Sequence, residues 1–129
     1  MTMELRMLAW ATALGLVHIL VAAALATGQR GLRWNVGNRD GAAVPLAGAA
    51  ARAARASANF LETFPLFAAA VLAAFVARRS GADTALGAQL YLWARVAYLP
   101  IYVTGIPYLR SAVWGVSMVG LLLVLSALL

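Results

Sequence analysis

Four apolar blocks divide the chain, and each is about twenty residues long, the length that a helix needs to cross the hydrocarbon core of a membrane. We predict helices at about residues 7–26, 56–77, 85–106 and 111–129. The 129 residues leave room only for links between these helices, so we expect a single four-helix membrane domain over residues 1–129. The predicted fold class is therefore an all-α integral membrane protein, a four-transmembrane-helix bundle.

The composition agrees with a membrane protein. Hydrophobic residues make up 64% of the chain and the mean hydropathy is +0.87, whereas ordinary soluble domains are about 45–50% apolar. The first block is longer than the core of a signal peptide, so we expect a retained helix. Cysteine is absent, which excludes disulfides, thiolate metal sites and cysteine nucleophiles.

All ten basic residues are arginines, and the net charge is +6. They gather at the ends of the predicted helices, where they act as topology signals and contact lipid headgroups or substrate, so no nucleic-acid partner is expected. The face that holds the first and third links carries six of them, and the opposite face carries three. By the positive-inside rule, we expect both termini to be non-cytoplasmic. The six are Arg30, Arg33, Arg39, Arg52, Arg55 and Arg110, and the three are Arg6, Arg78 and Arg79.

Two charged residues lie inside the apolar blocks, Glu62 in the second and Arg95 in the third. A lone charge at the centre of a membrane helix costs about 2.5 to 3.5 kcal/mol on insertion scales, so we predict that the two form a structural polar pair. Glu62 could instead face Arg52 or Arg55 of a neighbouring subunit. Arg55, Asn59 and Glu62 also share one helix face, which is a binding surface or only a structural polar seam.

The third block has a polar face of its own, formed by Tyr91, Arg95, Tyr98 and Tyr102. Tyrosine is common at membrane interfaces, so Tyr91 and Tyr102 alone carry little information. Tyr98 is three residues from Arg95 and is the favoured site residue. His18 is the single histidine, and no metal site is expected from it.

One segment of the sequence resembles a known family signature. The run RAARASANFLETFP at residues 52–65 contains Arg-Ala-x-x-Asn-x-x-Glu followed closely by proline, and this resembles the second helix of the MAPEG family, membrane-associated proteins in eicosanoid and glutathione metabolism. Residues 37–40, 94–98, 102 and 110–111 are similar to the first loop, the third helix and the start of the fourth helix in that family. The chain resembles its small bacterial members, so we expect a bacterial inner membrane.

The resemblance implies a homotrimer that holds glutathione, as a cosubstrate, between neighbouring subunits in the cytoplasmic half of the membrane. It also implies that Arg110 is the catalytic residue, which would stabilise the glutathione thiolate. The expected glutathione-binding residues are those carried over from the family, with Tyr98 added because of its place beside Arg95: Arg55, Asn59, Glu62, Tyr98 and Tyr102.

Three functions follow from these features. The first is a glutathione-dependent transferase or peroxidase that acts on lipophilic electrophiles at the membrane, with lipids and a lipophilic small molecule as partners. The second is a nonenzymatic lipid-binding or scaffold protein on the same fold, which would need no arginine such as Arg110 in the cleft between subunits. The third, a small multidrug transporter, is disfavoured because that class carries its carboxylate in the first helix.

Overall fold

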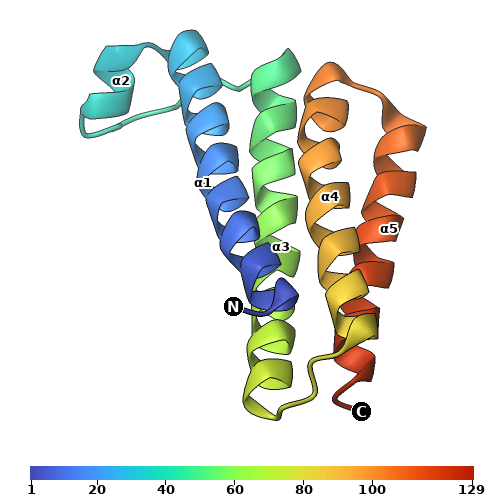
Figure 1. The fold of residues 1–129 in the computed structure, drawn as a ribbon. Helices are drawn as coiled ribbons and strands as arrows, with labels where there is room; N and C mark the ends of the chain where they lie inside the picture. The colour runs from blue at the N-terminus through green and yellow to red at the C-terminus, as the bar shows by residue number, and fades with distance from the viewer.

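The computed structural model describes residues 1–129, and its regular secondary structure is entirely helical. These are α1 (Met3–Arg30), α2 (Leu32–Val36), α3 (Gly48–Val76), α4 (Ala82–Thr104) and α5 (Pro107–Ser126). The four long helices lie side by side, and α2 projects beyond the end of α1 (Figure 1). By length and apolar composition α1, α3 and α5 can cross a membrane. The predicted all-α membrane class is confirmed.

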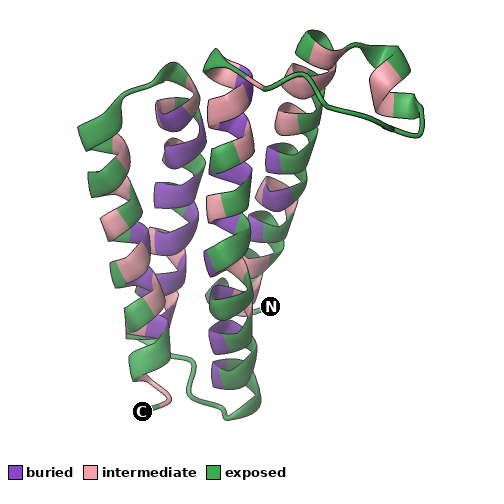
Figure 2. Ribbon diagram, turned by 180° about the vertical axis from the view of Figure 1, so that it is seen from behind, coloured by how far each residue is buried: buried purple, intermediate pink, exposed green.

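The inner helices of the bundle are α3 and α4. Each of them contacts all the other long helices, whereas α1 and α5 do not contact each other. Buried residues accordingly follow the inward faces of α3 and α4, and the outer faces of the bundle remain exposed, as lipid-facing surfaces would be (Figure 2). The core is formed mainly by Phe60, Phe67 and Val71 of α3 together with Tyr91 and Leu92 of α4.

The long helices begin earlier than the apolar blocks predicted. The helix α3 starts at Gly48, eight residues before the expected start at Ala56, and α5 starts at Pro107 rather than Ser111. Hydropathy marks the part of a helix that lies in hydrocarbon, whereas backbone hydrogen bonding continues into the polar interface. Proline suits the first turn of a helix because its missing N–H would have no partner there, so Pro107 begins α5.

The link between α1 and α3 is closed at its base. Gln29 Nε2 donates to the carbonyl oxygen of Ala47 at 2.9 Å, and the Ala47 N–H donates back to Gln29 Oε1 at 3.0 Å. The sequence did not predict α2 inside this link, because its glycines and proline are typical of irregular structure. Among the helices, α2 contacts α1 alone.

A hydrogen bond joins α1 to α4 at the opposite end of the bundle, the end near both chain termini (Figure 1). Thr84 Oγ1 donates to Glu4 Oε1 at 2.5 Å, and Glu4 is only 3% exposed. Closer to the middle, α4 and α5 meet at Gly87 and Gly120, where a Cβ built on Gly120 would lie 2.5 Å from the Gly87 carbonyl oxygen. Small residues permit this close approach of two helices in a membrane.

Candidate functional site

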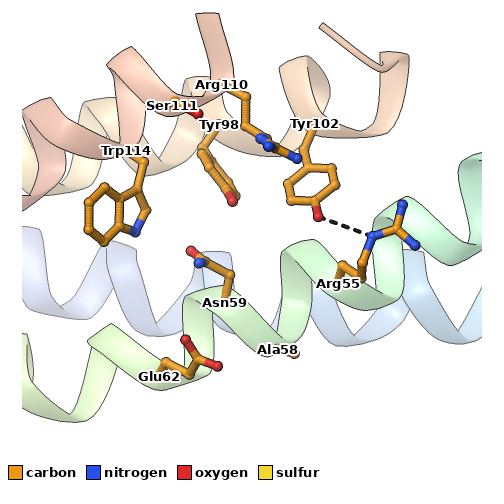
Figure 3. Close-up of a pocket in the computed structure, with 9 residues that line it drawn as sticks. All are labelled: Arg55, Ala58, Asn59, Glu62, Tyr98, Tyr102, Arg110, Ser111 and Trp114. Carbon is orange, nitrogen blue, oxygen red and sulfur yellow. Dashed lines mark hydrogen bonds between the residues drawn. The ribbon is translucent and has the colours of Figure 1, made fainter. Parts of the chain in front are cut away.

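All six residues that the sequence singled out for binding and catalysis line one cavity (Figure 3). The cavity has a volume of about 430 Å³ and lies between α3 on one side and α4 and α5 on the other. It is towards the end of the bundle where α2 projects. The six residues are Arg55, Asn59 and Glu62 of α3, Tyr98 and Tyr102 of α4, and Arg110 of α5.

Two guanidinium groups meet around the Tyr102 ring and make one end of the cavity cationic. Arg55 Nε donates to Tyr102 Oη at 3.1 Å (Figure 3), and Arg110 Cζ lies 4.6 Å from the centroid of the same ring. Because Arg55 donates to the phenol oxygen, the Tyr102 O–H remains available as a donor. A smaller space of about 130 Å³ adjoins this end and brings Arg52 beside Arg55 and Arg110. This end can therefore bind an anionic group.

The negative charge of the cavity comes from Glu62, which lies further along α3 than Arg55. Glu62 follows Arg55 by seven residues, which places it about 10 Å along the helix axis, and it is the only acidic residue that lines the cavity. Between these ends lie Asn59 and Tyr98, whose hydroxyl forms no hydrogen bond within the chain and points towards α3 (Figure 3). The cavity thus carries positive charge at one end and negative charge at the other.

The predicted contact between Glu62 and Arg95 is not formed within the chain. Arg95 is fully buried, and its Nη1 donates to Asn59 Oδ1 at 2.9 Å. The guanidinium also packs on the Tyr98 ring, with 4.4 Å between Cζ and the ring centroid. Glu62 is exposed one turn further along α3. The physical reason is rotational, since Asn59, and not Glu62, is on the part of α3 that faces α4.

Arg95 therefore acts beside the cavity rather than in it. Its side chain lines no part of the cavity, and its Nε and Nη2 have no hydrogen-bond partner. It holds Asn59 by a hydrogen bond and Tyr98 by a cation–π contact. Both of these residues do line the cavity, so Arg95 fixes the positions of two site residues.

Three other residues line the cavity that sequence reasoning did not single out: Ala58, Ser111 and Trp114. Helical spacing could have found Trp114, because it follows Arg110 by four residues and so shares its face of α5. Its indole supplies an apolar wall beside the polar groups. Tyr91, by contrast, lies in the core, where its hydroxyl is 3.0 Å from Thr63 Oγ1 and its ring stacks on Phe67.

Comparison with known proteins identifies the family of the chain. Searches of curated proteins and of solved structures find no match to the chain. The sequence pattern of the MAPEG family, however, matches residues 7–129. This range includes every residue of the cavity, and it includes all of the long helices apart from the first residues of α1. The resemblance seen in the sequence is thereby confirmed, and the chain belongs to the MAPEG family.

Proposed function

We propose that this protein binds glutathione in the cavity between α3, α4 and α5 and uses it as a cosubstrate. Members of the MAPEG family are generally membrane proteins of glutathione or eicosanoid metabolism. The observation that carries the proposal is the separation of charge in the cavity, with Arg55 and Arg110 at one end and Glu62 at the other. Glutathione carries two carboxylates and one ammonium group, so its charges complement this set.

The donor set fits such a ligand residue by residue. Guanidinium groups bind carboxylates through paired hydrogen bonds, which assigns the glycine carboxylate at one end of glutathione to Arg55, or to Arg52 beside it, and leaves Arg110 for the thiol. Glu62 would take the ammonium group. Asn59 and Tyr98 stand between these ends, where an amide and a phenol suit the polar backbone of a peptide.

The proposed activity is transfer to, or reduction of, lipophilic electrophiles at the membrane. When bound, glutathione supplies a thiol whose thiolate form is the nucleophile. The role of Arg110 is to hold positive charge close to this group, because a nearby cation lowers the pKa of a thiol and stabilises the thiolate. The Tyr102 O–H, left free by its bond from Arg55, can donate to the same anion. Trp114 offers an apolar surface for the electrophile.

We also propose that the protein is a homotrimer of four-span subunits in a bacterial inner membrane, with non-cytoplasmic termini. Glu62 is exposed on the single subunit, and a carboxylate facing lipid would be costly. A neighbouring subunit over the open side of the cavity removes that cost. The helix α4 serves as the fourth span, since it has 23 residues and packs between α3 and α5. Native mass spectrometry in mild detergent tests the trimer, and a helical monomer would contradict it.

The decisive experiment is glutathione binding to the purified protein in detergent, measured by isothermal titration calorimetry. We expect saturable binding that Glu62→Gln and Arg55→Gln each weaken about tenfold or more, since each removes a charge-assisted hydrogen bond. The matched control for Arg55→Gln is Arg79→Gln, which removes the same positive charge outside the cavity. Absence of saturable binding at millimolar glutathione would favour the lipid-binding or scaffold function instead.

A further inference from the structure

A second polar cavity lies at the same end of the bundle, on the side of α1. It has a volume of about 280 Å³ and is formed where α2 and the chain after it fold back against the end of α1 (Figure 1). We call it the α1–α2 cavity. Its polar lining comes from Thr27, Arg30, Asn35 and Arg39, and its apolar lining includes Trp34 of α2 and Ala23 and Ala26 of α1.

The two arginines of this cavity are held in place by other groups yet keep unpaired donors. Arg30 Nε donates to the carbonyl oxygen of Val44 at 2.8 Å. Arg39 Nη2 donates to Asn35 O at 2.9 Å and to Asn35 Oδ1 at 2.8 Å. Both Nη groups of Arg30 and Nη1 of Arg39 form no hydrogen bond within the chain. No acidic residue lines the cavity, so its charge is unbalanced.

Backbone strain at Arg39 supports a binding role. Its φ angle is +58°, in the left-handed region that residues with a side chain seldom adopt. Such a conformation is unfavourable by itself, and it persists where the surrounding structure requires it. Here the guanidinium bonds to Asn35, and both residues line the cavity.

The depth of the cavity identifies its ligand. The 28 residues of α1 extend about 42 Å at 1.5 Å per residue, whereas the hydrocarbon core is about 30 Å thick. The apolar block of α1 ends at about residue 26, four residues before Arg30, so the end of α1 at Arg30 lies at the level of the lipid headgroups. Trp34 is a residue type that is enriched at this level, and Ala23 and Ala26 continue the cavity towards the hydrocarbon.

We propose that the α1–α2 cavity binds the phosphodiester headgroup of an anionic glycerophospholipid. Guanidinium groups suit phosphate because they can donate two parallel hydrogen bonds to it. The quaternary ammonium of a zwitterionic headgroup would meet two arginines and no carboxylate, so the cavity selects lipids with net negative charge. The acyl chains would extend along the outer face of α1.

Native mass spectrometry of the detergent-solubilised protein tests this proposal, with phosphatidylglycerol and phosphatidylcholine of identical acyl chains as probes. We expect preferential retention of phosphatidylglycerol. Arg30→Gln and Arg39→Gln should each weaken its retention about fivefold, which corresponds to the ~1 kcal/mol that a basic residue contributes near an anionic lipid. The matched control is Arg33→Gln, because Arg33 belongs to α2 but does not line the cavity.

Three results would overturn the proposal. Equal retention of the two lipids would mean that the cavity does not select a headgroup. An equal loss of phosphatidylglycerol retention in Arg33→Gln and Arg39→Gln would mean that retention depends on the total charge of the link and not on the cavity. Displacement of phosphatidylglycerol by millimolar inorganic phosphate would assign the cavity to a free anion. Circular dichroism and the oligomeric state show whether each variant is folded. We expect the helical content and the oligomeric state of each variant to be unchanged, because among the helices α2 contacts only α1.

Discussion

The hydrogen bond between Asn59 and Arg95 should be one of the most important single polar contacts for stability. Asn59→Leu removes the only hydrogen bond made by a guanidinium that is fully buried, and leaves it with the ring faces of Tyr98 and Phe60, at 4.4 and 5.4 Å from Cζ. A hydrogen bond to a charged group contributes about 1.5–3 kcal/mol. We expect the upper part of this range, because the buried Nε and Nη2 already have no partner.

A double-mutant cycle measures this contact. Unfolding in mixed micelles with increasing dodecyl sulfate, followed by circular dichroism, gives the free energy of unfolding of each variant. Arg95→Met in the Asn59→Leu background should recover part of the loss, because replacing both partners by apolar groups removes the unpaired donor. We expect a coupling energy of at least about 1 kcal/mol.

The control cycle combines Glu62→Gln with Arg95→Met. Since no ion pair joins these residues within the chain, their effects should add to within about 0.5 kcal/mol. Additivity for Asn59 and Arg95 would refute the reasoning, and so would a larger coupling for Glu62 than for Asn59.

Three other substitutions test the helix contacts and the cavity. Gly120→Ala places a methyl group 2.5 Å from a backbone oxygen of α4 and should lower the free energy of unfolding by about 1–3 kcal/mol. The control is Gly115→Ala, which should not destabilise the protein because a methyl group added at Gly115 meets nothing within 4 Å. Thr84→Val deprives the buried Glu4 carboxylate of its 2.5 Å donor and should cost about 1–3 kcal/mol in the same titration, while Thr84→Ser should cost less. Arg110→Ala should leave assembly intact in native mass spectrometry but reduce glutathione conjugation of a lipophilic electrophile about tenfold or more, the effect of about 1.4 kcal/mol lost from anion stabilisation. Unchanged turnover in Arg110→Ala would exclude a role for this arginine in the chemistry.

The sequence predicted the long helices because apolar blocks of spanning length have few alternatives in a membrane. Hydropathy did not predict their starts, although the face shared by Arg55, Asn59 and Glu62 already extends the second helix before residue 56. Residues 48–55 are small or charged and lie before the apolar block, yet they form the first two turns of α3. They include Arg52 and Arg55, which lie at the cationic end of the cavity. Charged residues are compatible with a helix in the interfacial region, where water hydrates them, so hydropathy alone could not show that the helix reached them.

Helical periodicity correctly grouped Arg55, Asn59 and Glu62, which line the same cavity. It could not decide which of them meets Arg95. Asn59 and Glu62 differ by about 60° around the helix and about 4.5 Å along it, a difference smaller than the reach of an arginine side chain. The choice depends on how α3 is rotated against α4, which is set by packing of buried side chains such as Phe60 and Ala56. Attraction between opposite charges was therefore an insufficient guide to the partner.

The reciprocal hydrogen bonds between Gln29 and Ala47 have a consequence for how this protein can vary. They join the end of α1 to the residue that precedes α3, so the intervening segment leaves and re-enters the bundle at nearly one point. Its length and sequence can then change without moving either long helix, since a longer closed loop costs little additional entropy. Residues 31–46 are thus an exchangeable segment, and a short glycine–serine replacement of this segment that keeps Gln29 and Ala47 should preserve the positions of α1 and α3.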